Sequence, residues 1–187
     1  GRGFSFKKDE PLLMTMKKDP KDEDLTARDI VNTWEEKTLA DIIYGFGEEK
    51  YSRKIAKAIV ESRKEKSIET TFDLVEIIDK AVGRSYRGLK IHPSTRTFQA
   101  LRIATNSELS NLESVIEKGW RRLSVGGRMA IITFHSLEDR IVKQAYVALK
   151  HEGYANVITK KPIIPTSDEL INNPRARSAK LRIIEKI

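Results

Sequence analysis

The sequence contains no cysteine among its 187 residues. Disulfide bonds and thiolate metal sites are therefore excluded, and such a composition is typical of a protein from a reducing compartment. No apolar run is long enough to span a membrane, and no secretory signal opens the chain. We therefore expect a cytoplasmic protein that has no membrane partner.

Two sequence signatures of nucleotide binding are also missing. There is no G-x-G-x-x-G after a predicted strand and no G-x-x-x-x-G-K-[ST]. The glycine pair Gly126–Gly127 precedes a predicted strand, whereas a phosphate-binding loop follows one. The three histidines, at positions 92, 135 and 151, are too scattered to show a metal-ligand spacing. The sequence therefore predicts neither a cofactor loop nor a metal site within this chain.

Acidic residues are scarce in two parts of the chain. Lys and Arg outnumber Asp and Glu by 35 to 27, which gives a net charge of +8 at pH 7. Residues 84–102 contain five Lys or Arg and no acid, and residues 160–187 contain seven against three acids. Segregated positive charge favours a polyanionic partner such as a nucleic acid, because each neutralised phosphate releases condensed counterions. The alternative interpretation is an ordinary solvated basic surface.

Glycine and proline are sparse between residues 24 and 83, and helix signals follow one another there. Thr26 with Asp29 forms a capping-box pattern, and Thr70 or Thr71 is placed to cap a later helix. Apolar residues recur at helical spacing in EEKTLADIIYGFG, EEKYSRKIAKAIVESRK and FDLVEIIDKAV. These patterns predict a small helical subdomain. The preceding residues 1–24 predict a loop or linker, which the stretches FSF and PLLMTM would anchor to a core.

The second half of the chain alternates helix and strand patterns. A helical run from about Thr95 to Leu123, with a break near Asn106, stops at SVGG. The apolar run RMAIITF predicts a strand in the middle of a covered parallel sheet. A helix, a short strand at NVIT, a short helix capped by Thr166 and a strand around AKLRIIEKI follow. The order predicts part of an open α/β sheet that carries the helical subdomain as an insertion.

Ionisable residues follow the RMAIITF strand at once, in the sequence HSLEDR. Open α/β sheets bind ligands beyond the carboxyl ends of their strands, so a site is expected here. His135 and Ser136 are the candidate site residues. The alternatives are a loop hydrogen bond for His135 and an N-cap role for Ser136 or Asp139. Glu138, Asp139 and Arg140 fall within one helical turn, which favours a local ion pair over catalysis.

Several longer stretches together resemble one known family. They are RGFSFKKDEPL, FGEEKYSRKIAKAIV, HPSTRTFQALRIATNSEL, GGRMAIITFHSLEDRIVK and NPRARSAKLR. In this order they resemble the C-terminal two-thirds of the bacterial MraW family, the cytosine-N4 methyltransferases H of small-subunit ribosomal RNA. The resemblance implies an α/β fold: the later half of a Rossmann-like class I methyltransferase sheet with an all-helical inserted subdomain. Residues 1–24 would lead out of the sheet domain, 25–91 would form the insertion for substrate recognition, and 92–187 would form the C-terminal half of the sheet domain.

The same resemblance implies an enzyme that uses S-adenosylmethionine to methylate the N4 amine of a cytidine in 16S rRNA. The family's glycine-rich cofactor loop lies upstream of the matching region, so no cofactor residue is assigned here. Phe4 or Phe6 could stack on the base or the cofactor, and the alternative is that both are core anchors. His135 and Ser136 would lie at the rim of the pocket. The basic segments supply the candidates for RNA phosphate contacts, which are Arg84, Arg87, Lys90, His92, Arg96, Arg102, Arg175, Arg177, Lys180 and Arg182. Arg182 could instead lie on a strand face.

Two other functions stay open at this point. A non-catalytic RNA-binding module would keep the basic segments and lack the cofactor part. A phosphoesterase would use His135, Glu138 and Asp139, but the sequence offers no second cluster of ligands for it. The expected partner is 16S rRNA within the small ribosomal subunit, and a homodimer is compatible with the sequence.

Overall fold

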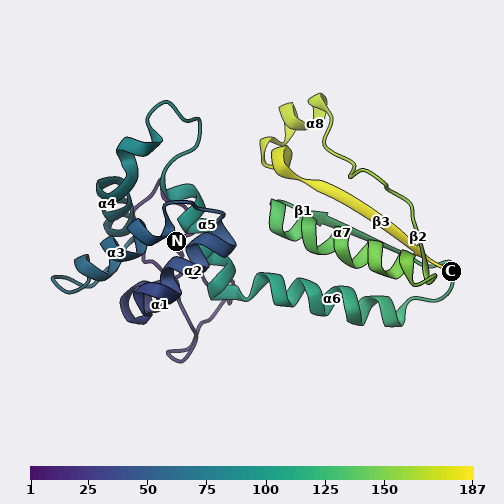
Figure 1. Cartoon of the computed structure of the whole chain (residues 1–187), viewed down its shortest axis with the longest axis horizontal. Coiled ribbons are helices and arrows are strands. Elements are labelled where there is room, and N and C mark those ends of the chain that lie inside the picture. Colours follow the sequence, from purple (N-terminus) through teal and green to yellow (C-terminus); the bar gives the residue numbers. More distant parts are fainter. The chain divides into compact units, whose positions relative to one another are not determined.

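The computed structural model describes residues 1–187, which form two compact units, Gly1–Glu108 and Leu109–Ile187 (Figure 1). The first unit is helical, and the second combines helices with a sheet. The chain therefore has the predicted α/β class. No helix combines the length and the apolar character that crossing a bilayer requires.

The helical unit is built from five α-helices and one 3-10 turn. They are α1 (Ala27–Thr33), α2 (Glu36–Gly47), α3 (Ser52–Ser62), α4 (Thr71–Val82), η1 (Gly83–Tyr86) and α5 (Ser94–Asn106). The predicted caps are present, because Thr26 caps α1 with Asp29 and Thr70 caps α4 with Asp73. In each capping box the two side chains satisfy N–H groups that the first helical turn leaves without partners.

The apolar faces of these helices share one core. Its fully buried residues include Ile30, Leu39, Ile43, Ile55, Ile59, Leu74 and Ile78. Gly47 of α2 lies directly against α5, because a Cβ atom there would lie 2.6 Å from the carbonyl oxygen of Arg96. A larger residue at Gly47 would therefore push the two helices apart.

The irregular segment before α1 is built into this helical core. Leu12 and Met14 are fully buried. The Leu12 N–H donates to the Glu69 carbonyl oxygen at 2.9 Å, and the Asn106 side chain donates to the Met14 carbonyl oxygen at 2.7 Å. PLLMTM thus anchors the segment as expected, but to the helical unit. The compact units divide after Glu108, which differs from the predicted division after residue 91 because α5 packs on α1 and α2.

The second unit contains three strands and the remaining helices. They are α6 (Glu108–Arg122, which begins at the last residue of the first unit), β1 (Arg128–Thr133), α7 (Ser136–His151), β2 (Ala155–Val157), α8 (Ser167–Asn172), η2 (Pro174–Ser178) and β3 (Lys180–Lys186). The predicted break near Asn106 is the junction of α5 and α6, where Ser107 adopts a left-handed conformation with φ 49°. Thr166 caps α8 by accepting from the Glu169 N–H at 3.2 Å.

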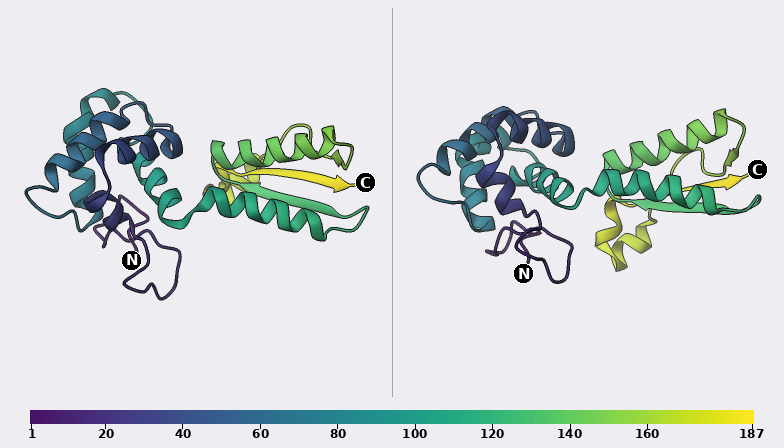
Figure 2. Two further views of the ribbon diagram at one scale, coloured as in Figure 1. Left: turned by 60° about the horizontal axis from the view of Figure 1, so that its bottom comes forward. Right: turned by 90° about the horizontal axis from the view of Figure 1, so that it is seen from below.

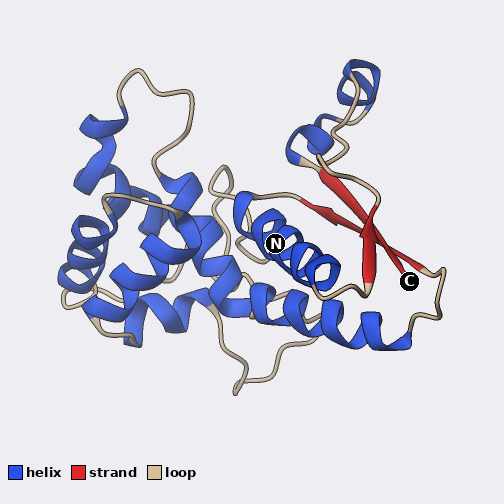
Figure 3. Ribbon diagram, turned by 45° about the vertical axis from the view of Figure 1, so that its right-hand side comes forward, coloured by secondary structure: helices blue, strands red, loops and turns tan.

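The sheet is antiparallel, with the strand order β1–β3–β2 (Figure 3). Strand β3 pairs with both neighbours, and its register with β1 runs from Arg128 opposite Glu185 to Thr133 opposite Lys180. The predicted parallel arrangement is wrong for the pairing of β1 with β3, which is antiparallel. Within the structure β1 is an edge strand, and its one partner is antiparallel.

Helices α6 and α7 cover one face of the sheet, and the other face is open (Figure 2). Ile116 of α6 and Val142 and Tyr146 of α7 pack with Ile184 of β3. On the opposite face Ile132 is 58% exposed. Strand β1 therefore carries apolar residues on both faces although only one face is covered, and this pattern led to the prediction of a central strand.

Candidate nucleic-acid interface

The first part of the first basic segment forms an exposed loop between α4 and α5, and the rest of the segment belongs to α5. We call Arg84, Arg87 and Lys90 the basic loop, since all three side chains are exposed and none forms an ion pair. The loop begins in η1 and turns at Gly88, whose φ of 79° suits glycine. Three unpaired cations on one short loop are available for phosphate groups.

A buried polar contact anchors this loop to the helical core. Tyr86 is 5% exposed, and its hydroxyl donates to the carboxylate of Glu49, which is fully buried. Glu49 also accepts from the Tyr51 N–H at 2.8 Å and lies 4.0 Å from the Arg96 guanidinium. Burial, followed by the neighbouring Glu49 carboxylate, raises the pKa of Tyr86 to about 12. Tyr86 therefore stays protonated and donates at any physiological pH.

Replacing Tyr86 with phenylalanine should lower the free energy of unfolding by about 1–3 kcal/mol, because the buried Glu49 carboxylate loses a donor. Urea denaturation of wild type and variant measures this difference. Tyr44→Phe is the matched control, because Tyr44 is 65% exposed and should change stability by less than about 0.5 kcal/mol. Equal midpoints for wild type and Tyr86→Phe would show that the contact contributes nothing.

The other cations of the first segment are engaged inside the protein. The imidazole of His92 stacks on Phe6, with ring centroids 4.7 Å apart, and its Nδ1 accepts from the Ser94 N–H at 3.2 Å. Arg102 donates to both carboxylate oxygens of Glu108, at 2.8 and 2.9 Å. These contacts do not fit the predicted phosphate roles of His92 and Arg102. Arg96 lies beside Glu49, which offsets its charge.

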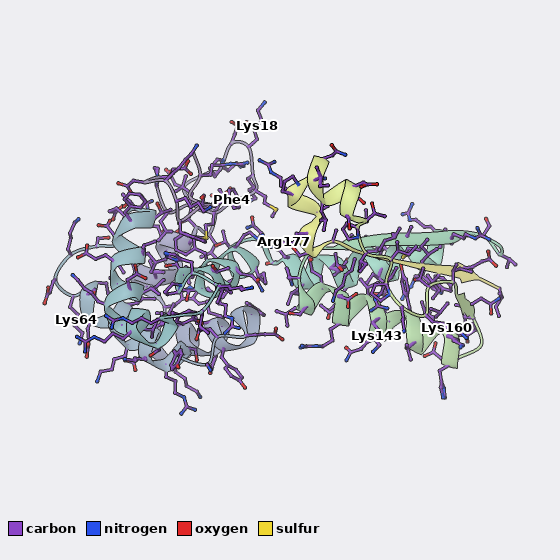
Figure 4. The ribbon with its side chains drawn as sticks, turned by 90° about the horizontal axis from the view of Figure 1, so that it is seen from above. Phe4, Lys18, Lys64, Lys143, Lys160 and Arg177 are labelled. Atoms are coloured by element: carbon purple, nitrogen blue, oxygen red, sulfur yellow. The ribbon has the colours of Figure 1, made fainter.

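Phe4 and Phe6 have different surroundings in the helical unit. Phe6 is half-buried and makes an edge contact with Phe98, at 5.6 Å between centroids. Phe4 is 37% exposed, and the Arg2 guanidinium lies 5.4 Å from its ring centroid (Figure 4). Phe6 is thus a core anchor, whereas the stacking role of Phe4 stays a prediction.

The second basic segment follows α8 and enters β3. Arg175 and Arg177 lie in η2, where both are exposed and form no ion pair (Arg177 is labelled in Figure 4). The two other predicted phosphate contacts of this segment, Lys180 and Arg182, both contact Asp139 of α7. Lys180 lies 3.3 Å from its carboxylate and keeps 39% of its side chain exposed. Arg182 is 6% exposed and donates to both oxygens, at 2.6 and 3.1 Å.

The burial of Arg182 corrects its prediction as a phosphate contact. Its guanidinium instead ties β3 to the first turn of α7 through Asp139. The hydrogen bond from Arg182 is the largest cause that lowers the pKa of Asp139 below its ordinary value. Asp139 therefore forms an ion pair with a residue that is distant in the sequence. The local ion pair that was predicted within Glu138, Asp139 and Arg140 does not explain this contact.

His135 forms the N-cap of α7, directly after β1. Its Nδ1 accepts from the Glu138 N–H at 3.4 Å, and Glu138 accepts in return from the His135 N–H at 3.3 Å. The expected cap by Ser136 or Asp139 is therefore wrong. Histidine is uncommon at an N-cap, but Glu138 three residues later is the capping-box signal that could have located it. Ser136 follows in the first turn with its side chain exposed.

The register of β1 and β3 brings the HSLEDR segment and the second basic segment to the same end of the sheet. Thr133, the last residue of β1, lies opposite Lys180, the first residue of β3. His135 therefore caps α7 at the end of the sheet where η2, which contains Arg175 and Arg177, leads into β3. The phosphoesterase alternative loses support, because Glu138 caps α7 and Asp139 is held by Arg182.

Comparison with known proteins identifies the family. The model of the MraW methylase family matches residues 1–187. The chain belongs to the MraW methylase family.

Relatives agree with this assignment. The chain is 53% identical over 186 residues to the ribosomal RNA small subunit methyltransferase H of Synechococcus elongatus, covering 100% of the chain and 60% of the relative. It is 51% identical over 185 residues to the protein of that name from Coprothermobacter proteolyticus, covering 99% of the chain and 60% of the relative. The chain thus spans about 60% of the length of these relatives.

A methylase of the MraW family implies a methyl donor, S-adenosylmethionine. The glycine pair before β1 does not fit a cofactor loop, because its N–H groups are already used. Gly126 donates to the Lys186 carbonyl oxygen at 2.8 Å, and Gly127 donates to the Ser124 carbonyl oxygen at 2.9 Å. A Cβ atom at Gly127 would also lie 2.8 Å from that Ser124 oxygen, so the glycine serves the turn itself. Gly126 and Gly127 therefore do not provide a cofactor loop.

Proposed function

We propose that the chain is the RNA-recognition part of an S-adenosylmethionine-dependent methyltransferase that modifies the N4 amine of a cytidine in 16S rRNA. The observation that carries this proposal is the family match over all 187 residues, with relatives named as small-subunit ribosomal RNA methyltransferases. The unpaired cations of the basic loop and of η2 support RNA as the partner. Residues 25–91 would form the substrate-recognition subdomain.

The chemistry of the reaction gives the RNA-binding part an active role. Cytosine N4 is a weak nucleophile because its lone pair is delocalised into the ring, so the amine must be held in line with the donor methyl group. Much of the rate then comes from positioning. The base must also leave its stack, which costs on the order of a few kcal/mol and is offset by contacts to the flanking RNA. In this proposal His135 and Ser136 lie at the rim of the cytosine pocket.

The open edge of β1 supports a larger, Rossmann-like sheet in the complete enzyme. Strand β1 has one neighbour, and its uncovered face carries the exposed Ile132. An unpaired strand edge exposes N–H and C=O groups that pair readily with another strand. We infer that β1 pairs there with a further strand and that the cofactor site belongs to that additional part.

RNA binding by the chain should weaken steeply as salt rises, because phosphate contacts release counterions. Replacing Arg84, Arg87 and Lys90 by alanine should lower the slope of log K against log salt by about 2, at about 0.7 for each contact to single-stranded RNA. Fluorescence anisotropy with single-stranded RNA from the 16S decoding region measures both slopes.

A flat salt response of the wild-type chain would remove the basis of the proposal. The control is a triple alanine variant of Lys37, Lys57 and Lys64, which are exposed cations elsewhere on the helical unit. The control should leave the slope nearly unchanged. The cofactor site is proposed to lie outside these residues, so S-adenosylmethionine should leave the binding curve unchanged. The non-catalytic RNA-binding alternative predicts the same curves, and methyl transfer by the complete enzyme distinguishes it.

A further inference from the structure

A hollow on the helical unit lies between α2 and the start of α3, outside the sites described so far. Its volume is about 430 Å³, and it is lined by Ala40, Asp41, Tyr44, Lys50, Ser52 and Arg53. This volume lies within the range of roughly 300–1,000 Å³ that is typical of small-molecule sites. A single nucleotide unit fits a space of this size.

The side chains around this hollow suit a nucleotide. Tyr44 is 65% exposed and offers an aromatic face to a base. Lys50 and Arg53 are exposed cations without a carboxylate partner, so they can contact a phosphate. Asp41 is an exposed acceptor that can bind an amino group on a base edge. Stacking, charge and a hydrogen-bond acceptor are thus present in one concavity.

A second hollow on the same unit shows what distinguishes the first. It has a volume of about 610 Å³ beside α4 and is lined by Phe72, Val75, Glu76, Asp79 and Lys80. Phe72 is 47% exposed, so an aromatic face is present there too. Its one cation, Lys80, is paired with Glu76 at 2.5 Å, and Asp79 adds a second negative charge. This hollow would repel a phosphate.

The hollow between α2 and α3 is joined to the basic loop through buried contacts. Glu49 and Tyr51, the two neighbours of Lys50 in sequence, both contact Tyr86. The ring centroids of Tyr51 and Tyr86 are 6.1 Å apart. Tyr86 immediately precedes Arg87 of the basic loop. These contacts hold the basic loop next to the turn that carries Lys50, which lines the hollow.

We propose that this hollow binds one unstacked ribonucleotide that flanks the modified cytidine. Its base stacks on Tyr44, and its phosphate contacts Lys50 and Arg53. A base that carries an exocyclic amino group donates to Asp41, so cytosine, adenine or guanine is favoured over uracil, which has none. The proposal rests on the RNA-binding function proposed above and adds a second recognised nucleotide to it.

Replacing Tyr44 with alanine should weaken binding of single-stranded RNA by about 5- to 150-fold, which is the range for losing one base–aromatic stack. Tyr44→Phe keeps the ring and should bind like wild type. The matched control is Phe72→Ala, which removes the exposed ring beside the acidic hollow and should leave affinity unchanged. Anisotropy titrations of the full chain measure all four affinities, and thermal melts verify that each variant is folded.

The cations of the hollow have their own test. The double variant Lys50→Ala/Arg53→Ala should lower the slope of log K against log salt by roughly 1.4, for two contacts to a single strand. Lys18→Ala/Lys64→Ala removes the same charge from other exposed positions, both labelled in Figure 4, and should change the slope far less.

The acceptor of the hollow is tested by base preference. Asp41→Ala should remove the preference for oligo(C) over oligo(U).

The outcomes separate this inference from the function on which it rests. Equal losses of affinity for Tyr44→Ala and Phe72→Ala, or equal slopes for the two double variants, would overturn the nucleotide site while salt-sensitive RNA binding persists. No preference of the wild-type chain for oligo(C) would overturn the assigned role of Asp41. Absence of salt-sensitive binding by the wild-type chain would instead refute the proposed function.

Discussion

Replacing Arg182 with alanine is expected to destabilise the sheet unit by about 3–5 kcal/mol. The side chains of Arg182 and Asp139 are 8% and 12% exposed, so removing the guanidinium leaves a carboxylate with little access to water. Lys180 lies 3.3 Å from the same carboxylate but is more exposed, and it compensates only in part. Chemical denaturation monitored at Trp120, the tryptophan of this unit, measures the change.

Arg128→Ala provides the matched control on the same sheet. Arg128 donates to Glu185 at 2.7 Å, but its side chain is 65% exposed. Exposed ion pairs contribute about 0–1 kcal/mol, so the control should remain close to wild type. Similar losses for Arg182→Ala and Arg128→Ala would show that burial of the Asp139 pair adds nothing.

The same pair predicts how stability changes with pH. Asp139 has a lower pKa in the folded protein than its ordinary value of 3.8, chiefly through the hydrogen bond from Arg182. Its contribution to stability is therefore fully present above 3.8 and is lost as pH falls through the lower, folded pKa. The difference in free energy of unfolding between wild type and Arg182→Ala should accordingly narrow in acid.

Replacing Leu12 with alanine should lower the stability of the helical unit by about 2–5 kcal/mol, the range for deleting a buried leucine side chain. Leu12 is fully buried although it lies in a segment without helix or strand. The Arg28 N–H also donates to its carbonyl oxygen at 2.7 Å, which fixes the start of α1 against it. Thermal or urea unfolding followed by circular dichroism measures the loss of helix.

The control for Leu12→Ala is Met16→Ala in the same segment. Met16 is 56% exposed, so the substitution should change stability by less than about 0.5 kcal/mol. If both variants unfolded at the wild-type midpoint, the segment before α1 would contribute nothing to the helical core.

Local signals in the sequence predicted the helices well. Thr26, Thr70 and Thr166 each cap the helix that their position indicated. The break between α5 and α6 also lies where the pattern near Asn106 placed it. Caps and apolar periodicity depend on residues three or four positions apart, so a single sequence contains them.

The sequence alone could not predict which residues far apart in the chain contact one another. An apolar strand such as β1 indicates apolar neighbours, but it does not reveal which strand pairs with it or in which direction. The pairing of Arg182 with Asp139 joins residues 43 positions apart, and that of Tyr86 with Glu49 joins residues 37 apart. Positive charge alone therefore could not separate the buried Arg182 from the exposed Arg175 and Arg177.

The unpaired edge of β1 and the exposed Ile132 on this strand have a practical consequence for work with the 187-residue chain. The unpaired N–H and C=O groups of this edge, next to exposed apolar side chains, can pair with an extended segment of another chain. At high protein concentration, that chain is another copy of the same protein. Self-association would then compete with RNA for the molecule. Dilute samples and a check of particle size thus belong in any assay that uses it.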